Sequence, residues 1–261
     1  MSIEDWVCPM DPDVHSDEPG RCPRCGMKLV LGVPERVEYR LALTAEPELL
    51  VPGRRATLAF RVLDPVTGHI VKRFNIVHEK LMHLFLVSEN LNYFAHEHPD
   101  LQDDGSFKLE VVLPFGGMYR VLADFYPIGS VPQLLMNTFF VSGRSETAHL
   151  SPALAPSRSV NLTASLKLDP EAPIAGLESN LFYTLDPATG LEPYLGNWAH
   201  MLLASEDLID LMHLHPFLAT GDVHVQFKVI FPRTGMYRIW TQFQRQGKVN
   251  TVVFTVPVKS L

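Results

Sequence analysis

The sequence predicts an all-β fold in which two tandem immunoglobulin-like antiparallel β-sandwiches follow a small N-terminal knuckle. Short runs rich in Val, Leu, Phe, Tyr and Thr recur along the chain, and Gly, Pro, Asp or Asn separate them. The apolar pattern of an amphipathic helix is nearly absent. The second half of the chain also repeats the first, which indicates two copies of one domain.

The chain separates into four segments. Residues 1–33 are short of apolar periodicity and rich in Pro, Asp and Cys, so they form the expected knuckle. Residues 34–143 and 160–261 form the two expected sandwiches, and the Ser/Pro/Ala-rich residues 144–159 form the expected linker. The expected strands lie within 37–45, 54–64, 81–88, 107–115, 118–126 and 134–142, and within 161–169, 178–186, 200–207, 223–231, 236–244 and 248–256.

Matching motifs define the repeat. The turn sequence at 63–68, LDPVTG, returns as LDPATG at 185–190, and Gly-Met-Tyr-Arg occurs at 117–120 and at 235–238. About seven short strands in each copy are typical of an antiparallel sandwich. A tyrosine at the start of a late strand suits the tyrosine corner of such folds, so Tyr119 and Tyr237 are expected to be structural.

Composition narrows the classes of partner. A formal net charge of −7 argues against nucleic acid as the main partner, because an acidic surface repels phosphates. No run of 18 apolar residues exists, so membrane insertion is not expected. The N-terminus lacks a basic start and an apolar stretch, which predicts a cytoplasmic protein, or a periplasmic one if a leader has been trimmed.

All three cysteines lie in the knuckle, at Cys8, Cys22 and Cys25. An odd, clustered count is a poor disulfide framework, whereas Cys-x-x-Cys commonly holds metal. A segment of about 30 residues cannot bury enough apolar surface to fold alone, so a metal ion is the usual staple. Cys8-x-x-Asp11 and Cys22-x-x-Cys25 offer four ligands to a zinc-ribbon-like site, and His15 is the alternative to Asp11.

The stretch VCPMDPDVHSDEPGRCPRCGMKLV, residues 7–30, resembles the small bacterial heavy-metal-binding domain of copper- and silver-efflux adaptors and metal-transporting ATPases. That family reads Cys-Pro-Met-His-Pro, then Pro-Gly-x-Cys-Pro-x-Cys-Gly-Met-x-Leu. The resemblance implies that Cys8, Cys22 and Cys25 are metal ligands. Asp11 stands where the family has histidine, a change that keeps zinc possible but suits soft Cu(I) less well.

Histidines form a second repeated pattern. His83, His96 and His98 return 117 residues later as His200, His213 and His215. Side chains at i and i+2 of a strand point to the same face, so each His-x-His pair is able to converge on one ion. With the buried-strand histidine thirteen residues earlier, each sandwich has three imidazoles for a zinc or copper ion.

Two interpretations of these histidines stay open at the level of sequence. A histidine before proline at a strand end also serves as a corner residue, and a duplicated domain inherits such a corner twice. Met82, Met201 and Met212 beside the histidines would favour Cu(I) as ligands, but methionine in strands is more often core filler. Asp124 could join the first set, yet its equivalent is Gln242, so a role shared by both repeats is not expected.

The sequence favours metal handling over catalysis. It has no nucleophile elbow, phosphate-binding glycine loop or His-Glu-x-x-His motif. The expected function is a zinc- or copper-binding protein with a cysteine site and three-histidine sites. The alternative is a tandem immunoglobulin-like module that binds a protein partner or a second copy of itself, with a purely structural knuckle.

Overall fold

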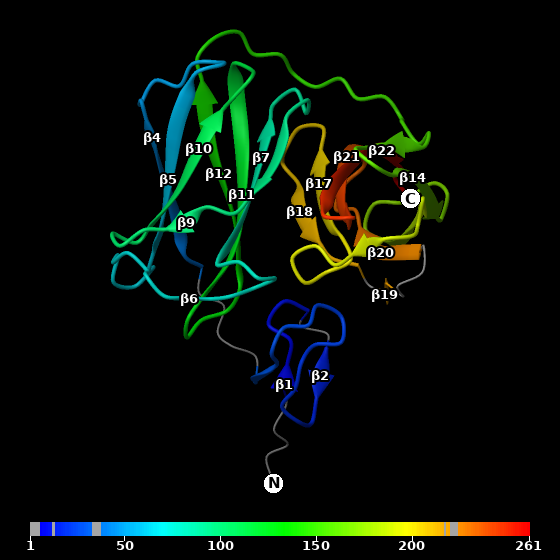
Figure 1. The fold of residues 1–261 in the computed structure, drawn as a ribbon, viewed down its shortest axis with the longest axis horizontal. Coiled ribbons are helices and arrows are strands. Elements are labelled where there is room, and N and C mark those ends of the chain that lie inside the picture. Colours follow the sequence, from blue (N-terminus) through cyan, green and yellow to red (C-terminus); the bar gives the residue numbers. More distant parts are fainter. Residues whose placement is uncertain (1–5, 12–13, 33–37, 217, 220–223) are drawn as a thin grey trace. The chain divides into compact units, whose positions relative to one another are not determined.

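The computed structural model describes residues 6–11, 14–32, 38–216, 218–219 and 224–261. The chain divides into two compact units, Met1–Thr147 and Ala148–Leu261 (Figure 1). The expected boundary between knuckle and first sandwich, at residues 33 and 34, lies outside the described residues.

The knuckle is a three-stranded antiparallel sheet in the order β2-β1-β3. Two irregular loops, one after β1 and one before β3, carry its cysteines. Its strands are β1 (Trp6–Val7), β2 (His15–Ser16) and β3 (Val30–Leu31).

The first sandwich consists of two antiparallel sheets. One has the order β4-β5-β10-β9, and the other has the order β12-β11-β7-β8 with β6 pairing with β11. The strands are β4 (Arg40–Glu46), β5 (Arg55–Leu63), β6 (Phe74–Asn75), β7 (Met82–Ser88), β8 (Phe94–Glu97), β9 (Asp100–Leu101), β10 (Ser106–Val112), β11 (Gly117–Pro127) and β12 (Gln133–Val141).

The second sandwich repeats the strand order of the first and adds β13 at the edge of one sheet. Its sheets have the orders β13-β14-β15-β20-β19 and β16-β21-β17-β18, with β22 pairing with β21. The strands are β13 (Ser157–Arg158), β14 (Thr163–Asp169), β15 (Glu178–Asp186), β16 (Leu191–Glu192), β17 (His200–Ser205), β18 (Leu211–Leu214), β19 (Leu218–Ala219), β20 (His224–Ile230), β21 (Gly235–Arg245) and β22 (Lys248–Val258). The expected all-β fold of two tandem sandwiches is confirmed.

Strand alternation gives each sandwich a core between its two sheets. In β7, Met82, Leu84 and Leu86 face the core of the first sandwich, so His83 and Phe85 point to the other face of that sheet. Both of these outward residues are nevertheless buried. The strand is therefore apolar on both faces, and the buried histidine sits opposite the core. The described part of the chain contains no helix long and apolar enough to cross a membrane.

The segment expected as a linker contributes to the second sandwich. Ala153 forms a β-bridge with Thr255, and Ser157–Arg158 form β13, which pairs with β14. Edge pairing of this kind satisfies backbone groups that a free linker would leave to water.

Both expected tyrosine corners are present. The Tyr119 hydroxyl donates to the Phe115 carbonyl and accepts from the Phe115 N–H, both at 3.1 Å. The Tyr237 hydroxyl makes the same pair of bonds with the backbone of Arg233, at 3.0 and 3.1 Å. Gly117 and Gly235 begin the two strands with φ of +103° and +128°, a region that favours glycine.

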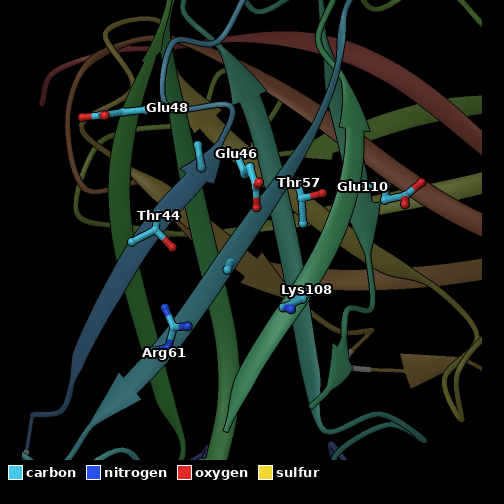
Figure 2. Close-up of a pocket in the computed structure, with 9 residues that line it drawn as sticks. Thr44, Glu46, Glu48, Thr57, Arg61, Lys108 and Glu110 are labelled. Carbon is cyan, nitrogen blue, oxygen red and sulfur yellow. The ribbon is translucent and has the colours of Figure 1, made fainter. Parts of the chain in front are cut away.

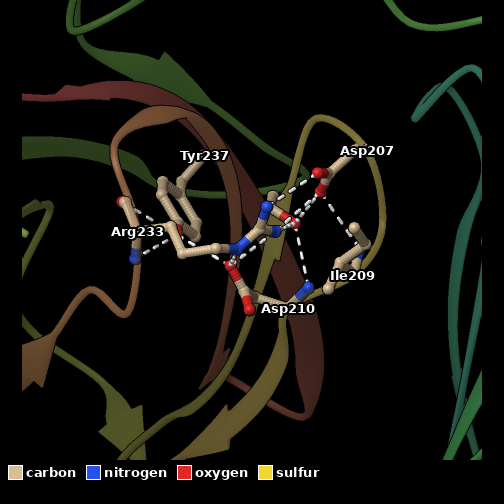
Figure 3. Close-up of polar contacts among 6 residues, drawn as sticks. Asp207, Ile209, Asp210, Arg233 and Tyr237 are labelled. Atoms are coloured by element: carbon tan, nitrogen blue, oxygen red, sulfur yellow. Dashed lines mark hydrogen bonds and ion pairs between the residues drawn. The ribbon is translucent and has the colours of Figure 1, made fainter.

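The second corner is reinforced by ion pairs (Figure 3). The Arg233 guanidinium pairs with Asp207 and Asp210, each at 2.9 Å. The Tyr237 hydroxyl also lies 2.9 Å from an Asp210 carboxylate oxygen. Burial, followed by this bond to Asp210, raises the pKa of Tyr237 to about 12.

We predict that Tyr237→Phe destabilises the second sandwich by about 1–2 kcal/mol, because it removes the hydroxyl that bonds the Arg233 backbone and lies beside Asp210. Tyr119→Phe is the matched change in the first sandwich. The bonds described above join the Tyr119 hydroxyl only to the Phe115 backbone, whereas the Tyr237 hydroxyl also contacts Asp210. We expect a smaller loss there. Calorimetric unfolding of both variants measures the difference, and equal melting temperatures for wild type and Tyr237→Phe would contradict the structural role.

Candidate metal centres

The knuckle loops bring four ligand atoms together, a group that we call the cysteine site: Cys8, Asp11, Cys22 and Cys25. The Sγ atoms of Cys8 and Cys25 are 3.5 Å apart. An Asp11 carboxylate oxygen lies 3.4 Å from Cys22 Sγ and 3.6 Å from Cys8 Sγ. Zinc–sulfur bonds of about 2.3 Å in a tetrahedron place sulfur atoms about 3.8 Å apart, so this spacing suits one ion.

Backbone hydrogen bonds shape both halves of the cysteine site. The Asp11 N–H donates to Cys8 Sγ at 3.2 Å, and the Cys25 N–H donates to Cys22 Sγ at 3.5 Å. Gly26, with φ of +74°, closes the second turn by donating its N–H to the Cys22 carbonyl at 2.8 Å. The Cys-x-x-Cys-Gly spacing thus places two thiols on one tight turn whose amides favour thiolates.

The three thiols do not share one acidity. A hydrogen bond from Cys25 outweighs burial and lowers the pKa of Cys8 to about 6. The same bond, together with burial, raises the pKa of Cys25, and burial raises the pKa of Cys22. Protein groups alone therefore stabilise one thiolate among two thiols, and a cation is what would favour three thiolates at once.

Asp11 occupies the fourth position of the cysteine site, and His15 does not belong to the group. The other Asp11 carboxylate oxygen accepts a hydrogen bond from Arg24 Nη1 at 3.2 Å. This ion pair orients the carboxylate, as outer partners do around metal ligands. Asp11 with Arg24 is neutral as a pair, so together they match the charge of the family's neutral histidine.

In the first sandwich, β7 and β8 bring together the first histidine site: His83, His96 and His98. His96 pairs with Phe85, the neighbour of His83 on the outward face, and its ring stacks on Phe85 with centroids 4.2 Å apart. His98 directly follows the end of β8, and its ring lies beside those of His83 and His96. His83 and His96 are buried.

Three ring nitrogens meet in the first histidine site. His83 Nδ1 lies 3.1 Å from His96 Nε2, and His98 Nε2 lies 3.2 Å from both. Three imidazoles bound to one tetrahedral ion at about 2.0–2.1 Å have nitrogens about 3.3–3.4 Å apart. The three rings are therefore close to the arrangement of a metal-binding tripod.

A backbone carbonyl sets the tautomer of His83. Its Nε2 lies 3.0 Å from the Val77 carbonyl oxygen, which only accepts hydrogen bonds, so the ring carries its proton on Nε2. Nδ1 then presents a lone pair to the other two rings. His83 directs no N–H toward the other two rings, so only His96 and His98 are able to supply protons to the three nitrogen–nitrogen contacts. Neutral rings therefore place a proton in at most two of the three contacts. One cation, in contrast, binds all three lone pairs.

The second sandwich repeats the arrangement in the second histidine site: His200, His213 and His215. His200 Nδ1 lies 3.3 Å from His213 Nε2, and the rings of His213 and His215 have centroids 4.4 Å apart. His200 Nε2 lies 2.9 Å from the Tyr194 carbonyl oxygen, so the same tautomer is selected. The two carbonyls come from equivalent tight turns, at Val77–Lys80 and Tyr194–Asn197.

The methionines beside the histidines point into the cores. Met82 and Met201 are buried core residues, and Met212 packs against the second core. They are neighbours of histidines in sequence but lie on the opposite face of each strand, as alternation requires. The alternative that methionine is core filler therefore holds.

A separate pocket of about 660 Å³ lies over the outer face of β4, β5 and β10 (Figure 2). Its lining mixes Arg61 and Lys108 with Glu46, Glu48 and Glu110. Figure 2 shows these charged side chains spread along three strands rather than aimed at one point. The surface offers no convergent ligand set comparable with the three metal sites.

The sequence identifies every residue of the three groups but not the atoms that orient their side chains. The Val77 and Tyr194 carbonyls lie six residues before His83 and His200, and no side-chain pattern marks them. The contact of Arg24 with Asp11 is likewise not evident from the sequence. Its signal was a basic residue inside the Cys-x-x-Cys turn, opposite an acidic residue at a ligand position.

The solved structures that this chain is similar to are distant. The Escherichia coli adhesin FdeC is 14% identical over 89% of this chain and 67% of its own, with a TM-score of 0.28. Red sea bream transglutaminase is 13% identical over 85% of this chain and 32% of its own, with a TM-score of 0.26. The chain thus spans two thirds or less of these proteins. No curated protein matches it.

Two family models match the chain. Residues 6–30 match the heavy metal binding domain, which includes all four residues of the cysteine site. Residues 35–140 and 147–260 both match one model, described as a domain of unknown function (DUF8832), with one sandwich and its histidine site in each copy. The chain therefore belongs to the DUF8832 family, in a duplicated form that follows a heavy-metal-binding domain.

Proposed function

We propose that this protein binds zinc or copper ions at three sites and serves in metal handling. The observation that carries the proposal is the convergence of three separate ligand sets, each with its ligand atoms within 4.8 Å of one another. The heavy-metal-binding domain at residues 6–30 supports the first of them. The two histidine sites are supported by their nitrogen spacing and by the carbonyls that aim one lone pair into each.

The ligand types narrow the choice of metal. Three thiols and a carboxylate suit Zn²⁺, since a hard oxygen ligand is a poor partner for Cu(I). Three imidazoles suit zinc or copper alike. The first histidine site has Asp124 opposite its buried-strand histidine and the second has Gln242, so the two sites share imidazole ligands rather than an acid–base group, and binding is the proposed role.

We predict that the protein, purified without a polyhistidine tag, holds up to about three metal equivalents, one for each ligand group. Cys22→Ser should remove about one equivalent, because thiolates are the strongest ligands of the cysteine site. His96→Ala/His98→Ala should remove another, and His213→Ala/His215→Ala a third. Elemental analysis of zinc and copper in the four proteins measures the stoichiometry.

The outcomes separate the parts of the proposal. A single equivalent lost only with Cys22→Ser would overturn the histidine sites and leave a structural knuckle. A protein that takes up no metal in any form would overturn the function altogether.

We predict that Arg24→Ala weakens zinc binding at the cysteine site about 10- to 100-fold, because outer partners of metal ligands typically contribute this much affinity. Arg21→Ala is the matched control: Arg21 lies in the same loop but donates to the Gly26 carbonyl rather than to a ligand. Competition with a chromophoric chelator measures both affinities. Equal losses in the two variants would assign the effect to general charge or folding instead of to Asp11.

We predict that metal leaves the first histidine site as the pH falls through about 6, where protons compete with the metal for imidazole nitrogens. Protonation adds charge to the empty rings, so affinity is full above this range and falls below it. Equilibrium dialysis of the Cys22→Ser variant against zinc between pH 7.5 and 5 measures the loss. Retention of full occupancy at pH 5 would contradict imidazole ligation.

A further inference from the structure

The two histidine sites share a tripod but differ in one buried residue beside it. In the β7–β11 register Asp124 lies directly opposite His83, and in the β17–β21 register Gln242 lies directly opposite His200. Asp124 is 4% exposed and Gln242 is 8% exposed. Residues directly opposite each other in an antiparallel pair have Cβ atoms about 4.5–5.5 Å apart and point to the same face.

The ring ligands themselves carry no net charge in either site. A divalent ion on three neutral imidazoles therefore brings two positive charges into the protein interior. Such charges are costly unless a counter-charge is buried with them. The Asp124 carboxylate supplies one negative charge next to the first histidine site. The Gln242 amide supplies none next to the second.

The rest of this face does not offset the difference. Arg120 opposite Val87 and Arg238 opposite Ala204 occupy equivalent positions in the two sheets, so they treat both sites alike. Glu97 stands between His96 and His98 but pairs with the core-facing Leu84, and so belongs to the other face of β8.

A second difference on these faces is Glu192, opposite Gln244, where the first sandwich has Asn75 opposite Tyr126. Glu192 is less buried than Asp124, and its carboxylate accepts hydrogen bonds from Gln244 Nε2 and from the Gly247 N–H. Water and these donors screen its charge, so the buried Asp124/Gln242 pair is the larger ionisable difference beside the tripods.

From this asymmetry we propose that the two sites are specialised by charge: the first histidine site takes a divalent cation, Zn²⁺ or Cu²⁺, and the second takes monovalent copper. With Asp124 counted, Zn²⁺ leaves a net charge of +1 in the first site. Cu⁺ leaves the same +1 in the second. Imidazole is a ligand for copper as well as for zinc. Asp124 and Gln242 are thus specificity-determining residues rather than ligands.

This inference rests on the proposed function, because it requires that both tripods bind metal. The test uses the full chain with Cys8→Ser/Cys22→Ser/Cys25→Ser, so that imidazoles are the remaining strong ligands. In that background, His213→Ala/His215→Ala isolates the first site and His96→Ala/His98→Ala isolates the second. Each protein is titrated with Zn²⁺ against a chelator, and anaerobically with Cu⁺ against a copper(I) indicator.

We expect Zn²⁺ to bind the first site 10- to 100-fold more tightly than the second, the range typical of outer-shell effects. Cu⁺ should bind the two sites with affinities within about tenfold. Asp124→Asn should remove the zinc preference of the first site and leave its Cu⁺ affinity nearly unchanged. Gln242→Glu should raise the zinc affinity of the second site, and this gain cannot arise from misfolding.

Glu97→Gln is the matched control, since it removes the same charge from the same region but from the opposite face of β8. An effect as large as that of Asp124→Asn would overturn the assignment to Asp124. Equal zinc affinities at the two sites would overturn the specialisation while leaving metal binding intact. Absence of any metal at either isolated tripod would overturn the histidine part of the proposed function together with this inference.

Discussion

One hydrogen bond in each sandwich determines what the three imidazoles are able to do. His83 Nε2 donates to the Val77 carbonyl and His200 Nε2 donates to the Tyr194 carbonyl. Each carbonyl also closes its own tight turn by accepting from Lys80 or Asn197, so the acceptor is held in place before the imidazole engages it. The bond leaves Nδ1 as a lone pair at the meeting point of the rings. Turn geometry thereby sets ligand chemistry six residues away.

Strand alternation separates that chemistry from stability. Along β7 the core-facing residues close the sandwich, while His83 and its outward neighbours build the site on the opposite face. The tyrosine corner, at the other end of β11 from Asp124, fixes the strand that pairs with β7. Substitutions of the ligands therefore leave the hydrophobic core untouched. The same scaffold therefore carries Asp opposite the histidine in one copy and Gln in the other.

The fold class and the grouping of the candidate ligands could be predicted from the sequence. Turn residues separate the strands, and the duplication shows each main strand twice, so the fold class and the main strand segments could be predicted. The ligands could be grouped because His-x-His and Cys-x-x-Cys spacings are local. The roles of the Val77 and Tyr194 carbonyls could not be predicted, because every residue has a carbonyl and only the folded turn determines which one meets the imidazole. Nor could Asp11 be chosen over His15 from spacing alone, because that choice depends on the path of the loop between β1 and β2.

A structural corner and a metal site require different partners for the imidazole nitrogens. A corner histidine needs one backbone acceptor, and His83 already has it in Val77. That bond gives no reason for His96 and His98 to bring two further nitrogens within 3.2 Å of Nδ1. Without a cation, at least one pair of these nitrogens is left in contact with no proton between them. The convergence of the three nitrogens therefore favours an ion as their common partner. The hydrogen bond to the Val77 carbonyl leaves the Nδ1 lone pair of His83 available to that ion.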